Sequence, residues 1–134
     1  MKVVWLTLTA LVSLSATALA QVHRPRMSYN AAHEITVSGT VVEVRDITRA
    51  GTPHGTYLFL KTPTDTLTIH LGPSWGVTKD RKALSPGDGV LVVGCFVNPG
   101  TSPILLAREV HRAGTVLTYR NAHGFPNFGP RRAP

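Results

Sequence analysis

The sequence is poor in cysteine. Cys95 is the only cysteine among 134 residues, so no disulfide can form within one chain. It lies in the apolar run from Val90 to Val97, which is typical of a strand buried on both faces. We therefore expect a packed thiol rather than a reactive one. A lone cysteine also excludes a Cys-x-x-Cys-His motif, and with it covalently attached c-type haem.

Acidic residues are few as well. The chain has 7 Asp and Glu against 14 Lys and Arg, a formal net charge of +7. It has no Gly-x-Ser-x-Gly motif, phosphate-binding glycine loop or His-Glu-x-x-His segment. We therefore expect no enzyme activity. The basic residues are scattered, so the charge points only weakly to nucleic acid or lipid.

The first twenty residues have the features of a cleavable secretory signal. Lys2 precedes an apolar run over residues 3–14, and Ala18-Leu19-Ala20 supplies small residues for cleavage. The apolar run is shorter than the roughly 20 residues that span a bilayer, which disfavours an uncleaved anchor. The chain has no Arg-Arg pair near its start, which argues against a twin-arginine signal. It has no cysteine directly after the cleavage site, which argues against a lipoprotein. We predict a periplasmic or secreted protein without a transmembrane anchor.

Cleavage after Ala20 removes 20 of the 134 residues and leaves 114, which suits one domain. Residues 21–33 are polar and are predicted to be a flexible lead-in. Residues 34–120 are predicted to form the folded domain. The Gly- and Pro-rich tail, residues 121–134, carries Phe125 and Phe128. The tail either packs back on the domain through these two rings or stays loose until a partner binds.

Period-two alternation predicts a chain of strands. They cover residues 35–44, 56–62, 66–71, 90–97 and 104–111. Gly39 inside the first strand indicates a sharp bend or a bulge. A short helix is predicted from Ser74 to Lys82, between strands three and four, and Ala113-Gly114 would precede a last strand at 115–119.

This order predicts an all-β fold: a small five-stranded OB-fold-like barrel with a short helix between strands three and four. A β-sandwich is the alternative. The size of the domain and the position of the helix favour the barrel, whose closure also removes exposed sheet edges.

Several segments together resemble a known group of domains. They are Ile35–Val41, His70–Trp75, Pro86-Gly87-Asp88 and Leu106–Val110. Over roughly residues 34–128 the chain is similar to small exported bacterial OB-like domains, including the C-terminal domain of the magnetosome proteins MamS and MamX. The Leu71-Gly72-Pro73-x-Trp75 segment is the most specific part. The resemblance implies a periplasmic accessory module, attached in some relatives to redox or iron-handling systems.

Four residues are candidates for ligand binding: His70, Trp75, Tyr57 and Arg108. His70 alternates away from Leu67, Ile69 and Leu71, beside a loop that bears Trp75. It could bind a ligand or be a surface histidine, and Trp75 could instead cap the bottom of the barrel. Arg108 and Glu109 are predicted to lie on opposite faces of the fifth strand, so one of the two charges lies at or near an apolar surface. Either that charge forms a salt bridge to another strand, or it belongs to a functional groove.

The six histidines raise the question of a metal site. None forms a local ligand pair with the spacing of a zinc site. A site assembled in space would most readily use His54 and His70. No cofactor is predicted, although a metal remains an option.

We predict a non-enzymatic exported binding module whose partner is an envelope protein. The alternatives are a metal-binding protein that uses scattered histidines, and a single-stranded nucleic-acid-binding domain. The second requires exposed aromatics among basic residues on strands two and three, where Tyr57 and Phe59 have only Arg45 and Lys61 as neighbours. Export separates the protein from most nucleic acid, which disfavours nucleic acid as a partner.

Overall fold

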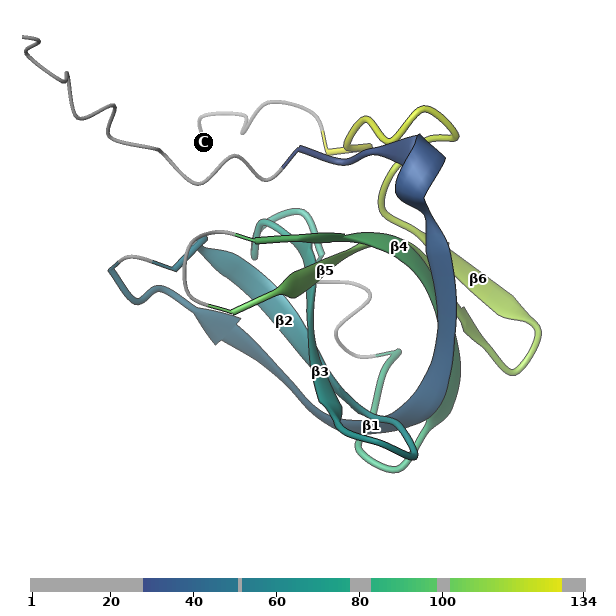
Figure 1. The fold of residues 1–134 in the computed structure, drawn as a ribbon. Helices are drawn as coiled ribbons and strands as arrows, with labels where there is room; N and C mark the ends of the chain where they lie inside the picture. The colour runs from purple at the N-terminus through teal and green to yellow at the C-terminus, as the bar shows by residue number, and fades with distance from the viewer. Residues whose placement is uncertain (1–27, 51, 78–82, 99–101, 129–134) are drawn as a thin grey trace, which may run out of the picture.

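The computed structural model describes residues 28–50, 52–77, 83–98 and 102–128. In these residues the chain is all-β apart from one turn of 3-10 helix, η1 (Ala31–His33) (Figure 1). The six strands are β1 (Ile35–Ile47), β2 (Gly55–Lys61), β3 (Thr66–Gly72), β4 (Gly89–Val97), β5 (Ile104–Arg112) and β6 (Thr115–Thr118).

The strands form one sheet that closes into a ring. Their order is β3-β2-β1-β4-β5-β6, and all neighbours in this order are antiparallel. A short parallel pairing of β3 with β5 closes the ring, with Ile69 opposite Leu105 and His70 opposite Leu106.

Strand β1 bends so that it can belong to both sides of the ring. Its residues 35–40 pair with β4, and its residues 40–47 pair with β2. A Cβ on Gly39 would collide with the main-chain oxygen of Lys61, so the bend needs glycine at this position. A bulge was one of the two options predicted at Gly39, and the irregularity in β1 lies nearby, where its register against β2 shifts between Val41 and Glu43.

The hydrophobic core fills the ring. Alternate residues of β2, β3 and β5 point inward, and Leu58, Ile69 and Leu105 are fully buried. Burying one such side chain contributes roughly 1.5–3 kcal/mol to the free energy that stabilises the fold. The core thus rests on the period-two pattern that the sequence shows.

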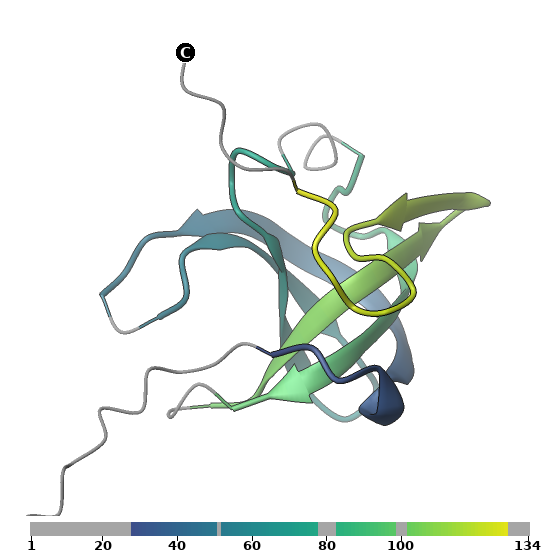
Figure 2. The same ribbon diagram turned by 90° about the horizontal axis from the view of Figure 1, so that it is seen from above.

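The C-terminal residues pair with the part of the β5 edge that β3 leaves unpaired. Strand β3 uses this edge at Leu105 and Leu106, and β6 uses it at residues 109–112. Between these pairings, the carbonyl of Arg108 accepts hydrogen bonds from the amides of Tyr119 and Arg120, at 2.8 and 3.3 Å. In Figure 2 the yellow segment that follows crosses over the green strands.

The predicted elements are present with two differences. There are six strands rather than five, because the last short strand pairs with β5. Where the helix was predicted, residues 73–77 form a turn, and residues 78–82 lie outside the described part. The predicted signal peptide and residues 21–27 of the predicted lead-in lie outside it too. In the residues that are described, no helix is long and apolar enough to cross a membrane.

Candidate functional site

A buried row of side chains crosses the outer face of the ring. Tyr57 pairs with His70, His70 with Leu106, and Leu106 with Cys95. Cross-strand partners point to the same side of a sheet, and Leu58, Ile69 and Leu105, the neighbours of three of these residues, belong to the core. The row nevertheless has exposures of 8% or less, so other segments must cover it. The predicted packed thiol of Cys95 is confirmed.

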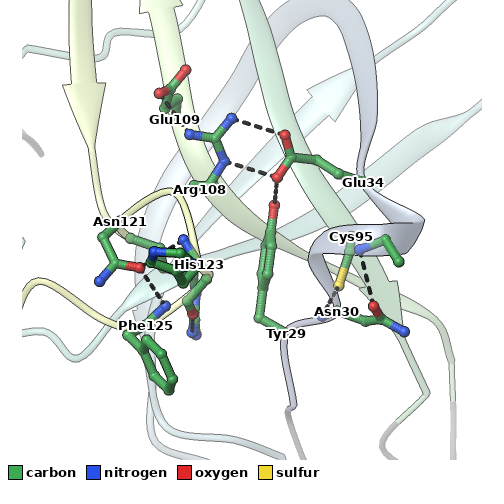
Figure 3. Close-up of polar contacts among 12 residues, drawn as sticks. Tyr29, Asn30, Glu34, Cys95, Arg108, Glu109, Asn121, His123 and Phe125 are labelled. Atoms are coloured by element: carbon green, nitrogen blue, oxygen red, sulfur yellow. Dashed lines mark hydrogen bonds and ion pairs between the residues drawn. The ribbon is translucent and has the colours of Figure 1, made fainter.

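Two segments cover the ends of this row. The β1–β2 loop covers one end: the Tyr57 hydroxyl donates to the carbonyl of Pro53 at 2.6 Å, and His70 Nε2 lies 3.3 Å from the carbonyl of His54. At the other end the amide of Asn30 donates to Cys95 Sγ at 3.3 Å (Figure 3). Part of the predicted lead-in therefore lies against the sheet.

His70 is a buried histidine rather than a surface one. It is 8% exposed, and its ring lies edge-on to Tyr57 with 5.0 Å between centroids. Burial lowers the pKa of His70, the carbonyl of His54 partly opposes this, and the charge of Arg120 adds to the lowering. Since a carbonyl only accepts, Nε2 carries the proton in the neutral ring. His70 Nδ1 has no hydrogen-bond partner among the described residues.

The proposed metal pair is only partly brought together. His70 meets the main-chain oxygen of His54, whereas the His54 residue is exposed. The described residues contain no group of three or more His, Cys, Asp or Glu side chains arranged to hold a metal ion. This arrangement gives the histidine-pair hypothesis no geometric support.

Trp75 lies in the turn after β3. It is 48% exposed, and its ring packs edge-on against Phe128 at 6.5 Å. Phe128 also contacts Tyr119, at 6.4 Å between centroids. The tail therefore packs back through Phe128, while Phe125 is 66% exposed.

Arg108 is the centre of a half-buried ion-pair network (Figure 3). Its Nε and Nη2 donate to the two carboxylate oxygens of Glu34, each at 2.8 Å, and its Nη1 donates to Glu109 at 2.8 Å. The Tyr29 hydroxyl donates to Glu34 at 2.6 Å. This bidentate geometry fixes the start of β1 to β5. The predicted salt bridge is present, but its partner Glu34 immediately precedes β1 and does not lie in another strand.

A bulge corrects the prediction that Arg108 and Glu109 face opposite ways. The β4–β5 register shifts between Val93 and Gly94, so one residue more is accommodated on β5. Ala107 and Val110 are both buried in the core, and the two charged residues between them meet on the outer side. The bulge also sets Glu109 beside His111, at 3.0 Å.

The network shifts the ionisation of its members. Hydrogen bonds from Arg108 lower the pKa of Glu34, against a smaller opposing effect of burial. Burial and the neighbouring Glu34 raise the pKa of Tyr29, and the hydrogen bond to Glu34 raises the pKa of Arg108. At neutral pH the site therefore holds a carboxylate, a guanidinium and a protonated phenol. Its geometry suits positioning of the chain rather than proton transfer.

A polar hollow of about 360 Å³ lies where β1 ends. It is lined by Arg45, Asp46, Ile47, Thr48, Arg49 and Thr52. The guanidinium of Arg45 lies over the ring of Phe59, 4.9 Å from its centroid. Since Tyr57 is fully buried, the aromatic pair required for nucleic-acid stacking is not exposed.

Sequence reasoning singled out Arg108 but missed its partners Tyr29 and Glu34 and the hollow. Glu34 is 74 positions from Arg108, and alternation within a strand gives no such long-range pairing. The two arginines four residues apart at the end of the first strand were the available signal for the hollow.

Residues 33–117 match the MamS/MamX magnetosome protein family, over more than half of the chain. The chain belongs to this family. The MamS/MamX match covers the Glu34–Arg108 pair and the hollow, whereas Tyr29, Arg120 and Phe128 lie outside it.

Comparisons beyond the family give little more. Among solved structures, the chain is similar to "OBody NL8 bound to hen egg-white lysozyme", with a TM-score of 0.47 and 17% identity. That similarity covers 61% of this chain and 94% of the other. No curated protein matches the sequence.

Proposed function

We propose that this MamS/MamX family protein is an exported, non-enzymatic binding module that serves an envelope redox or metal-handling system. The family match over residues 33–117 carries the proposal. The signal-like first twenty residues support export, since they combine a basic start, an apolar run and a small-residue end.

An OB-fold is the architecture that we propose for this module. Strands β1, β2 and β3 form a meander, β1 bends at Gly39, and β3 pairs in parallel with β5. Such five-stranded barrels carry ligands on an outer face and in adjoining loops. Here β6 and the segment after it would be additions to that plan.

The state of the charged groups supports binding rather than catalysis. Arg108 and Glu34 satisfy each other in a bidentate pair, and Arg112 pairs with Asp88 at 2.9 Å. Side chains that are held by each other in this way stabilise a surface and are poorly placed to attack a substrate. A closed ring of strands with loops at its ends fits a module that binds a partner.

Capture from the native cell tests this proposal. The tagged full chain should be recovered from the envelope fraction together with a redox or metal-handling protein. The matched control is the same chain without residues 1–20, which should stay in the cytoplasm and capture none of these partners. Recovery of the full chain from the cytoplasm, or identical partners for both baits, would contradict the proposal.

A further inference from the structure

Among the residues that the structure describes, the lining of the hollow at the end of β1 holds more basic than acidic residues. Its lining residues include two arginines, Arg45 and Arg49, and one acidic residue, Asp46. That carboxylate accepts a hydrogen bond from the Thr56 hydroxyl of β2 at 2.6 Å. One of its two oxygens is thereby held by the neighbouring strand.

Within the described part of the chain, Arg45 has only a weak ionic partner. Its Nε lies 4.0 Å from Glu43, and both side chains are about half exposed, at 52% and 51%. An exposed pair of this kind contributes at most about 1 kcal/mol. Arg49 forms no ion pair with a described residue. By contrast, Arg108 and Arg112 meet carboxylates at 2.8 and 2.9 Å.

Packing on Phe59 holds Arg45 in place. A guanidinium over an aromatic face keeps its edge free for hydrogen bonds, because the ring contacts only its flat side. Thr48 and Thr52, whose hydroxyls can donate hydrogen bonds, belong to the same lining. Residues with cationic donors and residues with neutral donors thus surround a space of about 360 Å³.

We propose that this hollow binds a compact phosphate-bearing anion. Guanidinium groups match the oxygens of phosphate with paired hydrogen bonds, and hydroxyls can donate to the remaining oxygens. The volume is within the range of small-ligand sites, roughly 300–1,000 Å³. The proposal names a ligand class for the binding module and in that sense rests on the proposed function.

A phosphate titration of the purified full-length protein tests the site. Inorganic phosphate is added to 15N-labelled protein at constant ionic strength, with chloride as the reference anion. We expect saturable shifts of the Thr48 and Thr52 amide signals. The double substitution Arg45→Gln/Arg49→Gln should weaken the affinity at least tenfold, whereas Lys61→Gln, which removes an exposed cation of β2 outside the lining, should leave it unchanged.

Three results would overturn the site. They are the absence of saturation, equal affinity in the double variant, and equal weakening by Lys61→Gln, which would indicate diffuse attraction. Unchanged signals from core amides show that the double variant is folded. If it does not fold, the single loop substitution Arg49→Gln replaces it, and we expect a severalfold loss of affinity.

Vesicles distinguish the two sources of a phosphate group. The protein could cosediment with phosphatidic acid vesicles but not with phosphatidylcholine vesicles. If the double substitution abolishes this cosedimentation, the phosphate belongs to a lipid headgroup. Saturation by inorganic phosphate without cosedimentation would assign it to a soluble ligand. Vesicle binding that survives the double substitution contradicts the site. Because the titration needs neither export nor a partner, its failure would leave the accessory role standing.

Discussion

At the scale of single residues, His70 links the stability of the protein to pH. The neutral ring fits its surroundings, since Nε2 meets the carbonyl of His54 and Nδ1 needs no partner to remain unprotonated. Protonation at Nδ1 would place a charged donor without a partner in a buried position. Arg120 adds electrostatic repulsion, because it is the charged residue that faces His70 from the C-terminal segment.

The free energy of unfolding should therefore decline as pH falls through about 6.5, the ordinary pKa of histidine. Below that value the unfolded chain takes up a proton that folded His70, with its lowered pKa, still rejects. The slope for one proton is at most about 1.4 kcal/mol per pH unit. Urea unfolding at neutral and mildly acidic pH measures it.

Two variants provide the controls for this prediction. His70→Gln should flatten the decline, since glutamine has no proton to gain. His54→Gln should keep it, because only the main chain of His54 contacts the buried ring. An unchanged slope in His70→Gln would show that another group is responsible.

Arg108 is the second residue with a predictable energetic role. It holds Glu34 with two hydrogen bonds, and their side chains are only 18% and 23% exposed. A double-mutant cycle with Glu34→Gln and Arg108→Gln should give a coupling energy of about 1–3 kcal/mol at neutral pH. Because the pKa of Glu34 is lowered, this coupling is present above about 4.5 and is lost as pH falls below it.

The exposed Glu43–Arg45 pair is the matched comparison. Its atoms are 4.0 Å apart and both side chains are half exposed. The same cycle there should give a coupling energy near zero, at most about 1 kcal/mol. Equal coupling in the two pairs would mean that burial does not strengthen the Glu34–Arg108 pair.

At the scale of elements, the bulge between β4 and β5 sets the position of Arg108 and Glu109. It requires close approach of the two strands at Gly94, where a Cβ would collide with the main-chain oxygen of Leu106. The oxygen that a Cβ at Gly94 would meet belongs to the main chain, which cannot rotate away as the end of a flexible side chain can. The bulge therefore depends on glycine at this position.

Gly94→Ala should lower the free energy of unfolding by roughly 2 kcal/mol and the melting temperature by several degrees. Gly89→Ala is the control, since nothing lies within 4 Å of a Cβ there and the residue starts the same strand. Thermal unfolding followed by circular dichroism measures both. Equal melting temperatures for the two variants would contradict the assigned role of Gly94.

The strands themselves could be predicted from the sequence, because local alternation encodes them. In β3, Leu67, Ile69 and Leu71 point one way in sequence and structure alike. The facing of Arg108 and Glu109 could not be predicted, because the extra residue on β5 is accommodated by Gly94 on a different strand. The burial of His70 depends similarly on segments far away in the chain, which a strand pattern does not contain.

At the scale of the whole molecule, the net charge does not lie on the described sheet. The basic residues described are Arg45, Arg49, Lys61, Arg108, Arg112 and Arg120. The acidic ones are Glu34, Glu43, Asp46, Asp65, Asp88 and Glu109, the same number. The formal charge of +7 therefore belongs to residues outside the described part. Among the described residues, Arg45 and Arg49 are the cations in the lining that would attract an anion to the hollow.

Export is the claim on which the proposed function most depends, because it decides which partners the module can meet. The intact mass of the protein recovered from the periplasmic fraction of its native cell tests it most directly. We expect a chain that lacks residues 1–20 and begins at Gln21. A full-length chain that is confined to the cytoplasm would contradict the exported role.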